Sequence, residues 1–196
     1  MQQLVNAWEK TAKVTGGAIA PAKCWWYLVE FIWDDSGEWS YKDHSHDNNY
    51  QLQALNANET LHQLQYIPPD TAQEMLGVFL TPDGNNKEQV RQLKLRAHTV
   101  AELIRTKHVY RHEAWLALTT MALKSIEYCL PATTLTDEQC KEIMWILIKD
   151  FLPKSGINRY IKRDVLYALP SSQGLGLKDI YLTQGISHIN EIIEHD

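Results

Sequence analysis

Apolar residues in the second half of the chain recur at spacings of three and four, the pattern of a helix that buries one face. The clearest case follows Asn86, where an apolar stripe is formed by Val90, Leu93, Ala97, Val100, Ala101 and Ile104. Asn86 and Gln89 have the spacing of a capping box, in which each side chain bonds the backbone of the other residue. The pattern therefore predicts a helix that begins close to residue 87.

Other segments also have helical patterns. A short helix is predicted over residues 4–14, and Gly16 and Gly17 end it. Residues 112–129 are apolar on nearly all sides, which predicts a buried helix that stops before Pro131. A second capping box, Thr136 to Gln139, precedes a helix with an apolar face of Ile143, Met144, Leu147 and Phe151. The last amphipathic helix is predicted over Ile180 to His195, with Ile186, Ile189, Ile192 and Ile193 on its apolar face.

The first half has the composition of short strands. Cys24 to Trp33 is apolar at almost every position, which is typical of a strand covered on both sides. Asp34 to Gly37 is a turn, so Glu38 to Lys42 is expected to return as the second strand of a hairpin. Further strands are predicted at Glu59 to Ile67 and at Met75 to Thr81, and the turn residues Pro82, Asp83 and Gly84 follow.

These elements predict an α+β fold, with a small antiparallel sheet or hairpin in the N-terminal half packed against a mainly helical C-terminal half. The 196 residues are enough for one domain or for two tightly packed subdomains. We place the division at residues 1–84, a β-rich subdomain, and 85–196, a helical subdomain.

Cations are concentrated in the helical half. Lys87, Arg91, Lys94, His98 and Arg105 lie on one line of the predicted helix, beside its apolar stripe. Between residues 87 and 111 there are seven Lys and Arg but only Glu88 and Glu102, whereas a solvated helix usually mixes both signs. A second cationic patch is formed by Lys154, Arg159, Lys162 and Arg163. The pattern favours contact with a polyanion, although the net charge of −5 is typical of a protein without that role, and a merely solvated face is the alternative.

Composition indicates a soluble intracellular protein, nuclear or cytoplasmic. The three cysteines are widely spaced and form no C-x-x-C pair, so neither a disulfide framework nor a zinc knuckle is supported. The first residues do not resemble a signal peptide, and no apolar run is long enough to span a membrane.

The sequence contains no specific catalytic or metal-binding motif. Nucleophile elbows, P-loops and H-E-x-x-H are absent, and Gly174-Leu175-Gly176 lacks the third glycine of a phosphate-binding fingerprint. Asp34 and Asp35 are best explained as a hairpin tip. His44 and His46 would share a face of a strand, but no third ligand is identifiable and Asn48-Asn49 follow, so a polar loop is expected. We therefore expect no catalytic residue, no metal and no cofactor.

Several segments together resemble retroelement reverse transcriptases of the non-LTR type. The resemblance lies in Thr15 to Tyr27 (TGGAIAPAKCWWY) and Leu76 to Gly84 (LGVFLTPDG), with weaker matches at Pro131 to Thr134 and Gly174 to Gly176. It covers most of the chain and matches the part of those RNA-directed DNA polymerases that follows the catalytic aspartates. One departure is Ala20, where members of the family often have asparagine.

The resemblance implies the end of a palm subdomain followed by a thumb. By it, Lys23 is the lysine that closes the fourth palm motif near the incoming nucleotide, the Leu76-Gly77 strand is the hairpin that grips the primer, and the helix from Lys87 opens the thumb. The aspartate pair that binds two metal ions in such enzymes would lie upstream of Met1, so we expect no polymerase activity from this chain alone.

The sequence thus indicates a catalytically incomplete, retrotransposon-derived fragment that contacts the backbone of an RNA/DNA hybrid or duplex, with the remaining palm and fingers of a polymerase as a further partner. The contact residues would be Lys23, Lys87, Arg91, Lys94, Arg105, Lys154, Arg159, Lys162 and Arg163. One alternative is a protein-interaction or scaffolding module without a nucleic-acid role. A second is an unrelated enzyme that uses Asp34, Asp35, His44 and His46.

Overall fold

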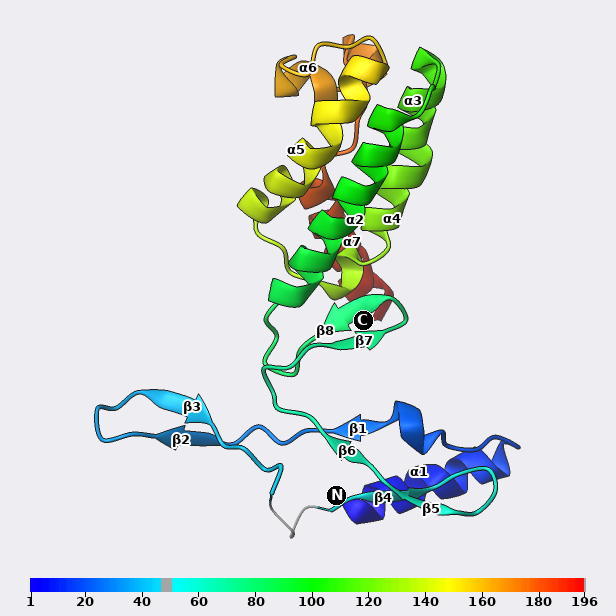
Figure 1. Ribbon diagram of the computed structural model, residues 1–196, viewed down its shortest axis with the longest axis vertical. Helices are drawn as coiled ribbons and strands as arrows, with labels where there is room; N and C mark the ends of the chain where they lie inside the picture. The colour runs from blue at the N-terminus through cyan, green and yellow to red at the C-terminus, as the bar shows by residue number, and fades with distance from the viewer. Residues whose placement is uncertain (47–50, 196) are drawn as a thin grey trace. The chain divides into compact units, whose positions relative to one another are not determined.

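The α+β class predicted from the sequence is confirmed in the computed structural model, which describes residues 1–46 and 51–195. Two-stranded sheets occupy the N-terminal half and helices the C-terminal half (Figure 1). The chain divides into two compact units. Unit 1 comprises Met1–Gln73 and Thr81–Asn85, and unit 2 comprises Glu74–Leu80 and Asn86–Asp196. The assignment of these halves as palm-end-like and thumb-like subdomains stays a prediction.

Unit 1 is built from one helix and short strands around a small core. Helix α1 (Gln2–Val14) is followed by a 3₁₀ turn (Pro21–Lys23). The strands are β1 (Trp25–Trp26), β2 (Phe31–Trp33), β3 (Trp39–Tyr41), β4 (Gln53–Leu55), β5 (Leu61–Gln63) and β6 (Gln65–Tyr66). They pair as β1 with β6, in parallel, and as the antiparallel hairpins β2–β3 and β4–β5. The buried core consists of Trp26, Leu52, Ala54 and Leu64.

The hairpin β2–β3 forms as predicted, but its surroundings differ from the prediction. Asp34 makes the turn, because its Oδ1 accepts from the backbone N–H groups of Ser36 (2.9 Å) and Glu38 (2.8 Å). The hydroxyl of Ser36 also donates to it, and these bonds lower the pKa of the Asp34 carboxyl. The expected continuous strand over Cys24 to Trp33 is instead two strands, and its second part is exposed on both sides, with Trp33 67 % exposed. The apolar run was therefore wrongly interpreted as a doubly covered strand.

Unit 2 consists of a hairpin and a set of packed helices (Figure 1). The strands are β7 (Gln73–Met75) and β8 (Val78–Leu80). The helices are α2 (Lys87–Thr106), α3 (Arg111–Ala117), a π-helical turn (Leu118–Ala122), α4 (Leu123–Glu127), α5 (Asp137–Lys154), α6 (Arg163–Tyr167) and α7 (Ile180–His195), with 3₁₀ turns at Leu130–Ala132 and Pro170–Ser172.

The hairpin β7–β8 replaces the single strand expected over Met75 to Thr81. Leu76 (φ 52°) and Gly77 (φ 83°) both have positive φ, the conformation of a type I′ turn, which glycine adopts without strain. Tyr128 donates its hydroxyl to the Leu76 carbonyl at 2.9 Å, which ties the turn to α4. The sequence Leu76-Gly77 is thus the turn of a hairpin and not the interior of a strand.

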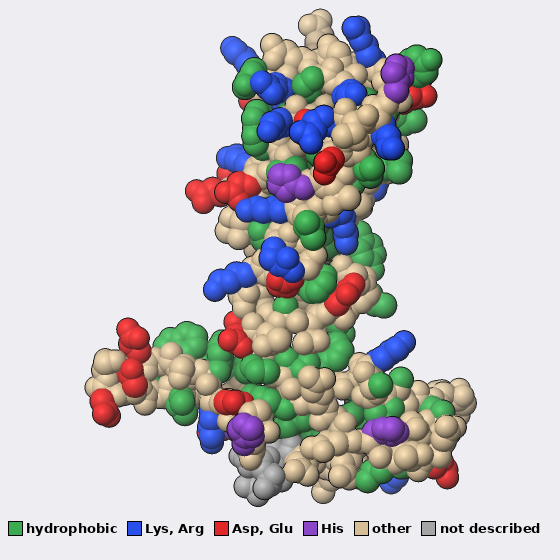
Figure 2. Space-filling view, viewed as in Figure 1, with side chains coloured by type: hydrophobic (Ala, Val, Ile, Leu, Met, Phe, Trp, Pro, Cys, Tyr) green, Lys and Arg blue, Asp and Glu red, His purple; other side chains and the backbone are tan. Residues whose placement is uncertain are grey.

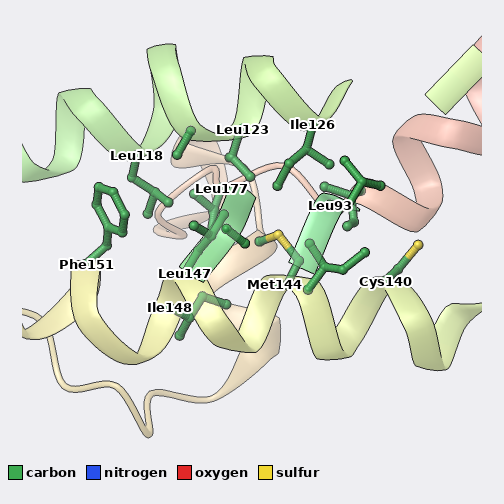
Figure 3. Close-up of a cluster of buried hydrophobic side chains, with 14 of the residues drawn as sticks. Leu93, Leu118, Leu123, Ile126, Cys140, Met144, Leu147, Ile148, Phe151 and Leu177 are labelled. Carbon is green, nitrogen blue, oxygen red and sulfur yellow. The ribbon is translucent and has the colours of Figure 1, made fainter. Parts of the chain in front are cut away.

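The core of unit 2 lies between α5 and the helices α2, α3 and α4. The apolar stripe predicted for α2 is confirmed, since Leu93, Ala97 and Ala101 are at most 2 % exposed. Figure 3 shows Leu118, Leu123 and Ile126 on one side of this core and the side chains of α5 on the other. The fully buried side chains include Leu93, Leu118, Leu123, Ile126, Leu130, Ile143, Leu147, Ile148, Phe151, Leu152, Leu166 and Leu177.

Of the two predicted capping boxes, one forms. Thr136 Oγ1 accepts from the Gln139 backbone N–H (3.2 Å), and Gln139 Oε1 accepts from the Thr136 N–H (3.0 Å). At α2 the box is absent, because Gln89 is buried and its Oε1 instead accepts from the Phe79 N–H of β8 at 2.7 Å. Asn86 donates to the Thr134 hydroxyl at 2.8 Å. Tertiary hydrogen bonds have replaced the local ones.

Two helices are less buried than their apolar sequences predict. The helix predicted over residues 112–129 is a continuous helical segment over 111–127, but Leu116, Met121 and Tyr128 are each more than half exposed. Helix α7 has the predicted bounds and packs through Ile180, Gln184 and His188. The four isoleucines predicted to form its buried face, Ile186, Ile189, Ile192 and Ile193, are instead 57–69 % exposed.

Burial separates the three cysteine thiols into two kinds. Burial raises the pKa of Cys140 to about 12 and also raises that of Cys129, while Cys24 is half-buried. A thiol of pKa about 12 is thiolate in only about one molecule in ten thousand at pH 8, and the thiolate is the reactive form. We expect one thiol per folded chain to react with iodoacetamide at pH 8 and three after denaturation, measured by mass spectrometry. Rapid labelling of all three in the folded protein would contradict this.

Candidate nucleic-acid interface

The cations predicted along α2 lie on its surface, but most of their charge is balanced. Arg91 is paired with Glu88 through two bonds, Nε to Oε2 at 2.8 Å and Nη2 to Oε1 at 2.6 Å. Lys94 Nζ lies 2.5 Å from Oε2 of Glu142 on α5. Arg105 lies 3.6 Å from Glu102, a looser contact between two exposed side chains. The N-terminal half of this line is therefore a row of ion pairs.

The Arg91–Glu88 pair persists at neutral pH. Hydrogen bonds from Arg91 and Gln92 lower the pKa of the Glu88 carboxyl to about 2. The carboxylate is consequently ionised throughout the physiological range, and a phosphate that approached Arg91 would compete with an established partner. Arg91 and Lys94 are thus poorer candidates for phosphate contacts than the sequence indicates.

The structure brings the C-terminal end of α2 against the second cationic patch. Lys154 Nζ donates to the carbonyl oxygen of Lys107 at 3.1 Å. Gly156 lies against Arg111, so that a Cβ atom built on this glycine would be 3.0 Å from the Arg111 side chain. Two stretches about fifty residues apart in sequence therefore form one surface of unit 2.

We call this surface the cationic cluster. It consists of Arg105, Lys107, Arg111, Lys149, Lys154, Arg159 and Arg163, together with Lys162, which precedes Arg163 at the start of α6. Figure 2 shows Lys and Arg side chains gathered at the end of unit 2 that includes α3 and α6. Within the described part of the chain, the members from Lys149 to Arg163 form no ion pair, in contrast to Arg91 and Lys94.

Two aromatic rings lie among these cations. The Arg163 guanidinium carbon is 5.6 Å from the centroid of the Trp145 ring, and that of Arg159 is 4.9 Å from the Tyr160 ring. The two rings are themselves 6.4 Å apart. Arg163 Nη1 is buried and has no hydrogen-bond acceptor among the described residues. Alternating cations and aromatic rings are the pattern of surfaces that bind single-stranded nucleic acid.

Sequence reasoning missed Trp145 and Lys149. A signal was available: Trp145 lies outside the apolar spacing of Ile143, Met144 and Leu147, so its place on the outer face of this helix could have been predicted. It is 39 % exposed. The proximity of Lys107 to Lys154 is a tertiary contact, which no spacing along the chain reveals.

The remaining predicted contact residues are placed differently. Lys87 begins α2 and is exposed, whereas Lys23 is exposed at the end of the 3₁₀ turn Pro21–Lys23 and belongs to unit 1. The structure therefore gathers Arg105, Lys154, Arg159, Lys162 and Arg163 in one unit and leaves Lys23 in the other.

Two of the four residues of the alternative enzyme hypothesis have structural roles. Asp34 forms the hairpin turn, and His44 is buried, with its Nε2 3.2 Å from Oε2 of Glu30. The loop expected around His44 and His46 is present over residues 42–46, although the side chain of His44 is buried in it, and its continuation through Asn48-Asn49 lies outside the described residues. Across residues 1–46 and 51–195, the structure has no group of three or more His, Cys, Asp or Glu side chains that could hold a metal ion.

Comparisons with known proteins add no assignment. No protein-family model, no curated protein and no solved structure matches this chain. Among the described helices, none combines the length and apolarity that crossing a bilayer requires.

Proposed function

We propose that unit 2 contacts the phosphate backbone of nucleic acid through the cationic cluster. The observation that carries the proposal is the convergence of Lys107 and Arg111 with Lys154 and Gly156, which joins two cationic stretches into one surface. Lysine and arginine that are not already paired release counterions from nucleic acid when they bind phosphate, and this release drives sequence-independent affinity.

The distribution of charge between the units supports the proposal. Unit 1 has four Lys and Arg against ten Asp and Glu, a net charge of −6, whereas unit 2 has fifteen against fourteen, a net charge of +1. The chain's overall charge of −5, which disfavours binding to a polyanion, thus resides in unit 1. Binding by unit 2 needs only a local excess of cations.

The resemblance of the sequence to reverse transcriptases supports the same proposal. By this resemblance the helical unit would derive from a thumb, the subdomain that contacts the template–primer backbone. Lys23 and Lys87 would then be further contact residues. The proposed ligand is the backbone of a hybrid, a duplex or a single strand. The proposal assigns no catalytic step to the chain.

A salt-dependent titration tests the proposal. Lys149→Ala with Lys162→Ala removes two cluster cations and should flatten the log–log dependence of affinity on salt by roughly 1.5 units, since each phosphate contact contributes about 0.7–0.9. Arg91→Ala with Lys94→Ala is a matched control, because it removes the same charge from cations that are already paired. We expect its salt dependence to change by less than half as much.

Several outcomes would contradict the proposal. If both double variants lose affinity equally, the cationic cluster is not the binding surface. If wild type has no measurable affinity for duplex, hybrid or single-stranded nucleic acid at physiological salt, the function itself is wrong. Circular dichroism of each variant checks that the fold is retained.

The second candidate function, a protein-interaction module, is favoured by α7. Leu182, Ile186, Ile189 and Ile193 follow the helical spacing of one face and are 57–69 % exposed. Contiguous exposed apolar surface is typical of interaction sites. This function predicts that the nucleic-acid titration gives no binding, and that substitution of Ile186 and Ile189 by aspartate leaves the fold intact while abolishing any self-association measured by sedimentation.

A further inference from the structure

A groove lies between α2 and α5 beside the cationic cluster. Helix α2 contributes His98, Ala101, Glu102 and Arg105, and α5 contributes Trp145, Ile146, Lys149 and Asp150. Its volume is about 250 Å³. This is slightly below the range of about 300–1,000 Å³ for pockets that hold drug-sized ligands, so the groove suits a single planar ring system.

Trp145 gives the groove an aromatic wall. The side chain belongs both to the groove and to the cluster, since the Arg163 guanidinium lies over its ring and Tyr160 is close by. Every nucleobase has a π-face, so stacking on an aromatic side chain does not depend on the nucleotide sequence. A tryptophan at the junction of a groove and a cationic surface is therefore suited to a base whose neighbouring phosphates lie on the surface.

The charged side chains that line the groove further restrict the chemical class of the ligand. His98, Arg105 and Lys149 offer donors to phosphate, with Arg105 in only a loose contact of 3.6 Å with Glu102. The carboxylates of Glu102 and Asp150, when ionised, can act only as hydrogen-bond acceptors. A simple anion such as phosphate would be repelled by the two carboxylates. A ligand that combines phosphates with a ring bearing N–H donors satisfies both kinds of side chain, and a nucleotide has that combination.

We propose that this groove takes one unstacked base of a single-stranded nucleic acid against Trp145, with the adjacent phosphates on Lys149 and Arg105. The inference deepens the proposed function and rests on it, because it specifies which form of nucleic acid unit 2 binds. Bases inside a duplex are stacked on one another and cannot enter, so a single strand or a frayed end is preferred.

The test compares a ten-nucleotide thymidine strand with an abasic strand of the same length and charge. Wild type should bind the base-bearing strand roughly tenfold more tightly, because stacking on one aromatic residue is lost in the abasic strand. Trp145→Leu retains apolar volume without a π-face and should remove this ratio, and Trp145→Phe should retain most of it. Trp8→Ala, which removes a tryptophan that is 70 % exposed on α1, should leave the ratio unchanged.

The outcomes separate this inference from the proposed function. If wild type binds both strands equally, or Trp145→Leu keeps the tenfold ratio, the base site is wrong while backbone binding stands. If a ten-residue oligoglutamate displaces the bound thymidine strand as effectively as an excess of the same thymidine strand does, the groove recognises acidic chains and the base site is also wrong. If wild type binds no strand, both proposals fail. A hairpin duplex with the same number of phosphates should bind more weakly than the single strand, and tighter duplex binding would overturn the single-strand preference.

Discussion

Replacement of Phe151 by alanine is expected to lower the free energy of unfolding of unit 2 by about 3–5 kcal/mol, the usual cost of removing a buried aromatic ring. Phe151 is 0 % exposed on α5, and Leu118 lies opposite it across the core (Figure 3). Because α5 packs against α2 and α3, the cavity would open where these helices meet and could not be filled by the movement of one loop. Urea denaturation followed by far-ultraviolet circular dichroism measures the loss.

Phe31 supplies the matched control. It is 44 % exposed on β2, where it contacts Trp39 and Tyr41 at ring-centroid distances of 5.3 and 5.5 Å. Phe31→Ala should lower the free energy of unfolding of unit 1, to which Phe31 belongs, by no more than about 1 kcal/mol, since only ring contacts on an exposed face are lost. An equal effect of the two substitutions would mean that Phe151 is not part of a closed core.

Elements with local determinants could be predicted from the sequence. Helix α5 begins at its capping box because Thr136 and Gln139 satisfy each other's backbone N–H groups without help from the rest of the chain. The stripe of α2 was likewise predictable, because a buried face leaves its period in the sequence. Asp34 at the hairpin tip follows the same logic, since its bonds reach only two and four residues along the chain.

Burial was less predictable than secondary structure. An apolar face shows that a surface would gain free energy if it were covered, but not that a partner is present in the chain. Ile186 and Ile189 on α7 have the period of a buried face and are exposed, and Trp33 is exposed on a strand that reads as doubly covered. The failed capping box at Gln89 has a related cause: the Phe79 N–H, ten residues away, outcompetes the local partner.

Only part of the candidate site could be predicted from the sequence. The pairs Glu88–Arg91 and Glu102–Arg105 are three residues apart, a spacing at which ion pairs form on a helix, so the partial neutralisation of the line could have been expected. The pairing of Lys94 with Glu142, and the convergence of Lys107 with Lys154, depend on how α2 packs against α5. The structure therefore moves the expected phosphate contacts from Arg91 and Lys94 toward the C-terminal end of α2, where Lys107 contacts Lys154 of α5.

Gln184 is the second residue for which a large effect is expected. It is 5 % exposed on α7, and its amide group forms both hydrogen bonds of the Leu135 backbone: Nε2 donates to the Leu135 carbonyl at 3.0 Å, and Oε1 accepts from the Leu135 N–H at 2.9 Å. Leu135 is itself buried at 3 %, so water cannot replace either bond. Gln184→Leu would leave two buried backbone groups without partners, at about 1–3 kcal/mol each.

We therefore expect Gln184→Leu to lower the free energy of unfolding of unit 2 by about 3 kcal/mol, measured in the same urea experiment. The matched control is Gln92→Leu, because Gln92 also donates a side-chain amide hydrogen bond, but to the surface carboxylate of Glu88, and should change stability by no more than about 0.5 kcal/mol. Amide hydrogen exchange adds a local readout: the Leu135 N–H should exchange slowly in wild type and in Gln92→Leu, and quickly in Gln184→Leu. Slow exchange of that N–H in Gln184→Leu would show that Gln184 does not hold the segment before α5 onto α7.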